Sequence, residues 1–132
     1  MILGIGTDLL EIGRMRELLD KEGGDRFLVR ILTPEELRLA EEREGRLAEY
    51  AAGRFAAKEA VVKAIGCGIG RTVGFQDVTV LPEPGGGGRP HAKLSAAAVQ
   101  RLGWDSANVR IHLSITHTRE YASAYAVVER LE

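Results

Sequence analysis

The chain has 132 residues but only one cysteine, Cys67, and its formal net charge is just −1 at pH 7. A single cysteine excludes an intrachain disulfide and is compatible with a reducing compartment. A nearly balanced charge gives no global electrostatic support for binding nucleic acid or a membrane surface. The sequence also lacks internal repeats and any apolar run that approaches the length of a membrane span. These absences favour a globular protein that binds neither nucleic acid nor membrane.

The amino end also lacks the features of a secretion signal. It has no basic residues ahead of its apolar start, and Asp8 interrupts that start. Since a signal peptide needs a basic segment followed by a longer apolar one, we expect a cytoplasmic protein. A chain of 132 residues is one domain by length and buries roughly two thirds of its unfolded surface. We therefore predict one domain over residues 1–132.

The most informative segment is RFAAKEAVVKAIGCGIG, residues 54–70. Alanines and other strong helix formers predict a helix from residue 46 onward that ends at Gly66. Glu59 and Lys63 are four residues apart and therefore share one face of this helix. A carboxylate beside cations and a glycine-rich backbone indicates phosphate and metal. The alternative is a solvated, charged helix with an i,i+4 ion pair.

Two further charges on this helix, Arg54 and Lys58, occupy unusual positions. At 100° per residue they project into the middle of the apolar sector, where a surface helix should carry no charge. Either their stems extend past the core to solvent, or this side of the helix meets a subunit or an anionic ligand.

A second acidic residue, Asp8, follows the apolar and glycine-rich start MILGIGT. This start predicts a short buried strand with Asp8 at or near its end. Asp8 has a simpler interpretation as the cap of the following helix. Gly4 and Gly6 weaken a strand, so they indicate a place where another group approaches the backbone closely.

A hairpin is predicted near the carboxyl end. Apolar and polar residues alternate over residues 111–116, and an Ala- and Val-rich strand over 121–129 follows a turn at 118–120. His117 then lies at the tip of a strand, a common place for a residue that contacts a ligand. A solvated or core-satisfied histidine is the alternative.

The remaining segments predict short elements. Residues 13–22 and 95–103 favour helices, and Thr33 with Pro34 and two glutamates is a typical helix start. Residues 77–81 and 91–94 favour two strands, joined by a glycine-rich loop over residues 82–90.

Three of these segments together resemble one family, the holo-acyl-carrier-protein synthases, which are short, free-standing phosphopantetheinyl transferases. The matching motifs are G-I-G-x-D at residues 4–8, R-F-A-A-K-E-A-x-x-K-A at 54–64 and S-I-T-H-T at 114–118. Between them, R-I-L-T-P-E-E-L at 30–37 and G-F-Q-D-V at 74–78 extend the resemblance over almost the whole chain. It implies an α+β fold in which a small antiparallel sheet packs with a long central helix.

The resemblance also implies a reaction. The 4′-phosphopantetheine arm of coenzyme A is transferred to a serine hydroxyl of an acyl carrier protein, and adenosine 3′,5′-bisphosphate is released. Asp8 and Glu59 would hold Mg²⁺ on the pyrophosphate of coenzyme A, since this ion commonly takes only one or two carboxylates. Lys63 would add positive charge beside the transferred phosphoryl group, and Glu59 is the candidate base. The implied coenzyme A contacts are Arg54, Lys58, Gly66, Gly68, His117 and Thr118.

The same resemblance implies partners. An acyl carrier protein presents an acidic surface, which Arg14, Lys21 and Arg26 could bind, with Leu18 as an apolar anchor. An ordinary mixed-charge surface is the alternative, because acidic residues are interspersed here. The family forms cyclic homotrimers with active sites at the subunit interfaces.

Two other functions remain open. A metal-dependent nucleotide or pyrophosphate hydrolase could use Asp8, Glu59 and Lys63 for attack by water. A carrier-protein-binding module without activity could retain the fold, although it would have no need of both acids and Lys63.

Overall fold

A computed structural model describes residues 1–131. Its elements, in chain order, are β1 (Ile2–Glu11), α1 (Ile12–Asp20), α2 (Gly24–Ile31), α3 (Pro34–Glu41), α4 (Leu47–Ile65), the 3₁₀ turn η1 (Phe75–Asp77), β2 (Val78–Pro82), β3 (Pro90–Leu94), α5 (Ala96–Leu102), the 3₁₀ turn η2 (Ser106–Asn108), β4 (Val109–His117) and β5 (Tyr121–Arg130).

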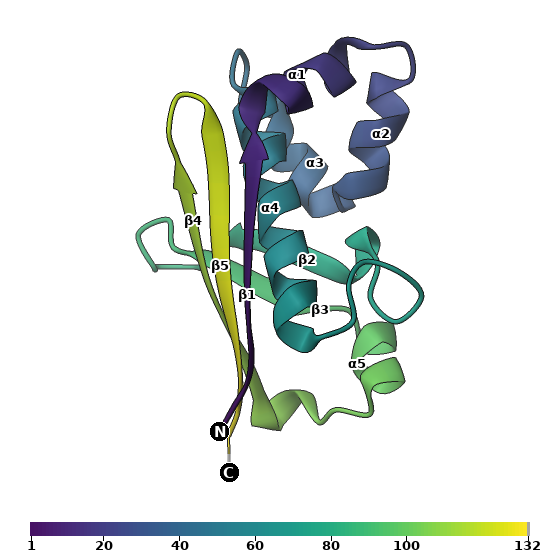
Figure 1. The fold of residues 1–132 in the computed structure, drawn as a ribbon, viewed down its shortest axis with the longest axis vertical. Helices are drawn as coiled ribbons and strands as arrows, with labels where there is room; N and C mark the ends of the chain where they lie inside the picture. The colour runs from purple at the N-terminus through teal and green to yellow at the C-terminus, as the bar shows by residue number, and fades with distance from the viewer. Residues whose placement is uncertain (132) are drawn as a thin grey trace.

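The strands form two antiparallel sheets, one of three strands in the order β1-β5-β4 and one of two strands, β2-β3. Helix α4 runs through the middle of the molecule beside the larger sheet (Figure 1). In the register of that sheet, Asp8 lies opposite Ala124, which in turn lies opposite Ile115. Since side chains alternate across a strand, these three point to the same face, the one covered by α4. The expected α+β fold with a long central helix is confirmed.

Local capping chemistry sets several helix ends where the sequence predicts them. The Thr33 side chain accepts from the backbone of Glu36 in a capping box, and Ser95 caps α5 in a similar way. Helix α4 ends at Gly66, whose φ of 95° is in the left-handed region that favours glycine. The sequence analysis missed α2, because that helix begins after Gly23 with no side-chain cap.

Strand β1 rests directly on the backbone of α4. A Cβ atom at Gly4 would overlap the carbonyl oxygen of Ala64, and one at Gly6 would overlap that of Ala60. The predicted close approach at these glycines is therefore confirmed, and the group that approaches is the helix. Asp8 lies within β1, three residues before its end, and the N-cap of α1 is Glu11. The alternative that Asp8 caps this helix is wrong.

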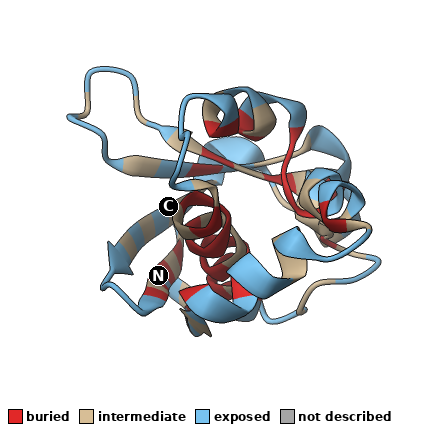
Figure 2. Cartoon of the chain, turned by 90° about the horizontal axis from the view of Figure 1, so that it is seen from above, coloured by how far each residue is buried: buried red, intermediate tan, exposed pale blue. Residues whose placement is uncertain are grey.

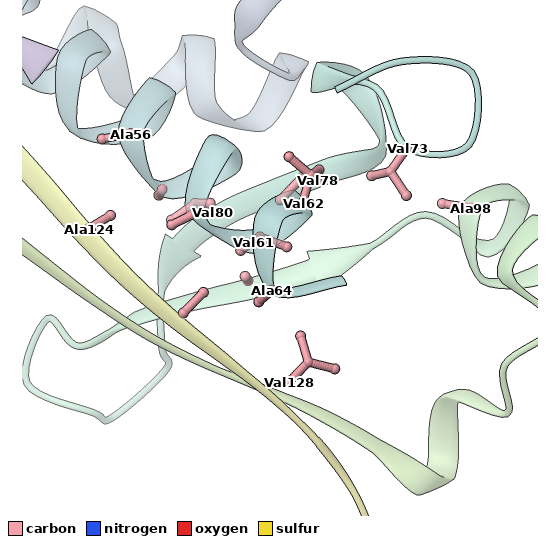
Figure 3. Close-up of a cluster of buried hydrophobic side chains, with 14 residues drawn as sticks. Ala56, Val61, Val62, Ala64, Val73, Val78, Val80, Ala98, Ala124 and Val128 are labelled. Atoms are coloured by element: carbon pink, nitrogen blue, oxygen red, sulfur yellow. The ribbon is translucent and has the colours of Figure 1, made fainter. Parts of the chain in front are cut away.

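Most of α4 is buried, as the central position of the helix in Figure 2 shows. Its carboxyl-terminal half contributes Val61, Val62 and Ala64 to a cluster that includes Val80 of β2 and Val128 of β5 (Figure 3). Among residues 1–131, no helix has the length and apolar character needed to cross a bilayer. The buried α4 is instead the element on which both sheets and the functional side chains are arranged.

Candidate functional site

Three charged side chains meet where β1 passes α4. Lys63 Nζ donates to Asp8 Oδ1 at 3.2 Å and to the backbone carbonyl of Thr7 at 3.0 Å. Glu59 lies one turn before Lys63 on α4, close enough to Asp8 and Lys63 for both charges to shift its pKa. Close contact between β1 and α4 brings these residues together from segments about fifty residues apart, because the glycines leave no side chains between the two backbones.

The electrostatics of this corner are unusual. Partial burial raises the pKa of Glu59 above its usual value of 4.5, the nearby Asp8 carboxylate raises it further, and Lys63 opposes both. The Asp8 side chain is only 17% exposed, whereas Lys63 is 50% exposed. Two carboxylates therefore share a partly buried corner with one ammonium group, and a second cation would reduce their repulsion.

The donor set fits Mg²⁺. Asp8 and Glu59 offer hard carboxylate oxygens, and Mg²⁺ completes its octahedron with water and substrate phosphate oxygens. Within residues 1–131, no cluster of three or more His, Cys, Asp or Glu side chains is arranged to hold a metal. The site is thus suited to a cation that the substrate helps to bind, and it is not a closed cage for a structural metal.

Arg54 lies on the same helix, five residues before Glu59. Its guanidinium stacks over the Tyr50 ring, 4.6 Å from the centroid, in a cation–π contact. Its Nε is buried and has no hydrogen-bond partner among the described residues. A buried donor without an acceptor is costly, so an acceptor supplied by a bound ligand would stabilise it.

His117 ends β4 and lies against α4 at Gly53. A Cβ atom at Gly53 would lie 2.9 Å from His117 Nε2, so the absence of a side chain at Gly53 makes room for the imidazole. The sequence analysis missed Gly53, although a glycine inside a strong helix was the signal available for it. The imidazole of His117 thus lies against the residue that precedes Arg54 on α4.

Lys58 requires a correction. Its side chain is fully buried, and its ammonium donates to Glu36 Oε1 at 2.6 Å and to the carbonyls of Ile31 at 2.7 Å and Phe75 at 2.9 Å. All three N–H groups are used within the chain, so Lys58 is not a contact to coenzyme A. The charge in the apolar sector is explained by Glu36, whose buried position the sequence analysis did not foresee.

Gly66 and Thr118, two other predicted contacts, make hydrogen bonds that serve the fold. The Gly66 N–H donates to the Val62 carbonyl, so it cannot bind a phosphate, and that expectation is wrong for Gly66. Gly68 follows with a φ of 67° and lies in the turn after α4. The Thr118 hydroxyl accepts from the Tyr121 N–H at 2.9 Å and closes the β4–β5 turn.

The predicted docking residues lie on α1, α2 and the turn between them. Arg14, Lys21 and Arg26 are exposed and Leu18 is half-buried. Lys21 is the C-cap of α1, and its extended ψ of 159° turns the chain away from the helix after it. On α2, Val29 is 58% exposed, an apolar residue that the sequence analysis did not single out.

A separate groove of about 1000 Å³ lies between β3, β4 and α5. Trp104, Val109 and Leu113 line it together with His91 and His112. It includes none of the residues predicted for the site. The predicted charged residues Asp8, Glu59 and Lys63 converge instead at the corner of β1 and α4.

Comparisons with known proteins agree on one family. The family model described as the 4′-phosphopantetheinyl transferase superfamily matches residues 4–126. The chain is 46% identical over 132 residues to the holo-[acyl-carrier-protein] synthase of Geobacillus kaustophilus. The aligned region covers 99% of this chain and 92% of that protein.

Solved structures agree in fold. The holo-(acyl-carrier-protein) synthase of Bacillus anthracis, crystallised with CoA (3′,5′-ADP), is 40% identical, with a TM-score of 0.81 and coverage of 98% of each chain. The synthase of Neisseria meningitidis is 36% identical, with a TM-score of 0.87 and coverage of 98% of this chain and 100% of that one.

Proposed function

Because the chain belongs to the holo-acyl-carrier-protein synthases of the 4′-phosphopantetheinyl transferase superfamily, we propose that it modifies an apo-acyl carrier protein. A serine hydroxyl oxygen of the carrier attacks the phosphorus that bears the pantetheine arm of coenzyme A. The pyrophosphate bond breaks, and adenosine 3′,5′-bisphosphate leaves. The observation that carries this proposal is the convergence of Asp8, Glu59 and Lys63 at one corner.

Each of the three residues has a role in this reaction. Asp8 and Glu59 would hold Mg²⁺, which supplies a Lewis acid and a template for the pyrophosphate when it is bound. Lys63 places a fixed positive charge beside the transferred phosphoryl group, where negative charge develops. Glu59 is the base that accepts the proton of the attacking serine.

Arg54 and His117 bind the nucleotide part of coenzyme A and its 3′-phosphate in this proposal. The support is the unpaired Nε of Arg54 and the position of His117 against Gly53, the residue before Arg54. Gly68 remains a proposed backbone contact. Thr118 does not, because its N–H donates to the Tyr121 carbonyl at 2.8 Å. The Thr118 hydroxyl is occupied in its turn, so we assign no side-chain role to it.

The carrier protein docks on α1 and α2 in this proposal. Arg14, Lys21 and Arg26 would meet its acidic surface, and Leu18 and the exposed Val29 would supply apolar contacts. Reversing Arg14 to Glu should raise the KM for the carrier protein far more than the KM for coenzyme A. Equal effects on both constants would argue against docking at Arg14.

A homotrimer with active sites at its interfaces is also part of the proposal. Ile5, Leu9, Tyr121 and Tyr125 lie on the face of the larger sheet that α4 does not cover, and they are 67%, 66%, 40% and 60% exposed. An exposed apolar patch on a sheet indicates a partner. Sedimentation of the wild type and of Tyr125→Glu tests this assembly, and an active wild-type monomer would contradict it.

One experiment tests the reaction and its metal together. The chain is incubated with apo-carrier protein, coenzyme A and Mg²⁺, and the carrier is weighed by mass spectrometry. We expect the added mass of one phosphopantetheinyl group, which a chelator prevents. We expect this work to take place in the cytoplasm, where coenzyme A and a carrier protein would be available together.

The rival functions give different results in the same assay. A hydrolase would release phosphopantetheine from coenzyme A without any carrier protein. A binding module would leave the carrier unmodified. In that case Glu59→Gln would not change the activity, because the wild type would have none. Loss of turnover in Glu59→Gln with carrier binding retained supports the transferase.

A further inference from the structure

The buried pair of Glu36 and Lys58 takes no part in the reaction described above, yet Lys58 immediately precedes Glu59 on α4. We propose that Glu36 and Lys58 are positioning residues that set the rotation of α4 about its axis and so hold Glu59 against Asp8. The inference rests on the proposed function for its consequence in catalysis, and on the contacts of the two side chains for its geometry.

Lys58 is fixed by three different parts of the chain. Its ammonium group donates to the carbonyl of Ile31 at the end of α2, to the Glu36 carboxylate on α3 and to the carbonyl of Phe75 in η1. These acceptors lie 2.6 to 2.9 Å away, and the side chain is 0% exposed. With every N–H directed at a different element, the lysine cannot turn without breaking a buried hydrogen bond.

Glu36 is fixed equally well. Its Oε1 also accepts from the Thr33 N–H at 2.7 Å, and its Oε2 accepts from the Val80 N–H of β2 at 2.6 Å. Tyr50, earlier on α4, donates its hydroxyl to the Glu36 carbonyl at 2.9 Å. Helix α4 is therefore tied to Glu36 at two places, two turns apart, and Glu36 is tied to α3 and β2.

This fixed point determines where Glu59 points. Neighbouring residues on a helix project about 100° apart, so a fixed direction for Lys58 fixes that of Glu59. A carboxylate about 6 Å from the helix axis would move by roughly 2 Å if the helix turned by about 20°. Misplacement by about 1 Å can already lower a reaction rate by about 100-fold.

The contact of α4 with β1 offers little resistance to such a turn, because it joins Gly4 and Gly6 to the backbone at Ala64 and Ala60. Small residues also predominate on either side of Glu59, where Ala56, Ala57, Ala60 and Ala64 are buried beside the larger Val61 and Val62. Helices resist sliding when projecting side chains interlock with their neighbours, and alanines project very little. A directional ion pair can supply the missing constraint, because such pairs contribute more to register than to net stability.

The test compares Lys58→Met and Glu36→Gln with the wild type and with Val128→Ala, a buried core variant that touches neither residue. Each is assayed at a temperature where circular dichroism shows it folded. For Lys58→Met we expect kcat to fall about tenfold or more, with the KM for the carrier protein changed by less than about twofold. Glu36→Gln keeps the lysine and should show a smaller fall of the same kind.

A crystal structure of Lys58→Met provides a second readout that does not depend on activity. In the wild type, Lys63 Nζ lies 3.2 Å from Asp8 Oδ1. We expect this separation to exceed about 4 Å in the variant, which is beyond ion-pair contact. Val128→Ala should keep both the separation and kcat, although it loses stability.

The outcomes separate the two proposals. A wild type without transferase activity contradicts the proposed function, and the crystal structures still decide the geometry. An active wild type with unchanged kcat and unchanged separation in Lys58→Met overturns the positioning role. If Lys58→Met does not fold, Glu36→Gln decides: a kcat within about twofold of the wild type overturns the proposal, and a larger fall at constant carrier KM supports it.

Discussion

Helix α4 is held by its neighbours in two different ways. On the side of β1, Gly4 and Gly6 let the strand backbone rest on the helix carbonyls of Ala60 and Ala64. On the side of α2, α3 and β2, a single buried ion pair joins Lys58 to Glu36. Adding a side-chain atom at Gly4 or Gly6 would destabilise the first contact, whereas removing either charge would destabilise the second.

The comparison shows how a small protein can hold a cluster of charged residues next to its hydrophobic core. Close backbone contact brings Asp8 within reach of Lys63 and Glu59, and it does so without interlocking side chains. The ion pair adds the directional restraint that alanines and glycines lack. Substitutions that perturb one contact at a time test whether the two contacts have these separate roles.

The largest effect is expected from breaking the polar contact. Lys58→Met leaves the Glu36 carboxylate buried without its cation, and we expect a loss of about 3–5 kcal/mol in the free energy of unfolding. Urea unfolding measures this loss. The control is Glu49→Gln, which breaks the exposed pair of Arg16 and Glu49 and should cost less than about 0.5 kcal/mol. Similar losses in the two variants would contradict the structural role of Lys58.

A slightly smaller effect is expected from adding one carbon to the close contact. Gly6→Ala places a Cβ atom against the carbonyl of Ala60, a backbone group that cannot move aside, and should cost about 3 kcal/mol. Gly13→Ala is the matched control in α1, because nothing lies within 4 Å of its added Cβ. That control should gain about 0.5–1 kcal/mol from better helix propensity. Thermal or urea unfolding distinguishes the two.

Gly53→Ala sharpens the comparison, since here the neighbour is the movable His117 imidazole and not a backbone. Better helix propensity should leave stability unchanged or raise it by up to about 1 kcal/mol. The displaced imidazole should weaken coenzyme A binding by about tenfold, ~1.4 kcal/mol, in calorimetric titration. An unchanged affinity would remove His117 from the proposed nucleotide contacts.

The smallest effect concerns the charge of Glu59 in metal-free protein. Its pKa is raised in the folded state, so the folded chain binds the proton more tightly and loses stability as pH rises above the usual value of 4.5. Glu59→Gln cannot ionise. The free energy of unfolding of this variant should equal that of the wild type below that pH. At neutral pH it should be higher by about 0.5 kcal/mol, a small difference because solvent screens the partly exposed Glu59 charge. Unfolding measured across pH in chelator checks the sign, and a wild type more stable than the variant at neutral pH would contradict it.

Local signals in the sequence were sufficient for most elements. Thr33, Ser95 and Gly66 act within one helical turn, so their side chains or backbone freedom identify helix ends without reference to the rest of the chain. Helix α2 has no such cap and was missed. The fold class was predicted through a family resemblance carried by motifs in three segments, which periodicity alone would not have joined.

The candidate site was predicted in part. Asp8, Glu59 and Lys63 were named from the sequence, and the structure brings them together. Their roles in catalysis stay predictions, as do those of Arg54 and His117. Lys58 was assigned to the ligand because the sequence showed its charge in an apolar sector but not the partner that satisfies it.

The sequence by itself determined several helix ends, the alternation of the strands and the small residues that allow β1 to approach α4, because each depends on residues near one another along the chain. Only the tertiary structure decided that Lys58 pairs with Glu36, that Gly53 makes room for His117 and that Ile5 and Tyr125 lie exposed on one face of the sheet. These facts depend on which distant segments pack together. The role of a buried charge or of a glycine is defined only by the residue from another segment that lies against it.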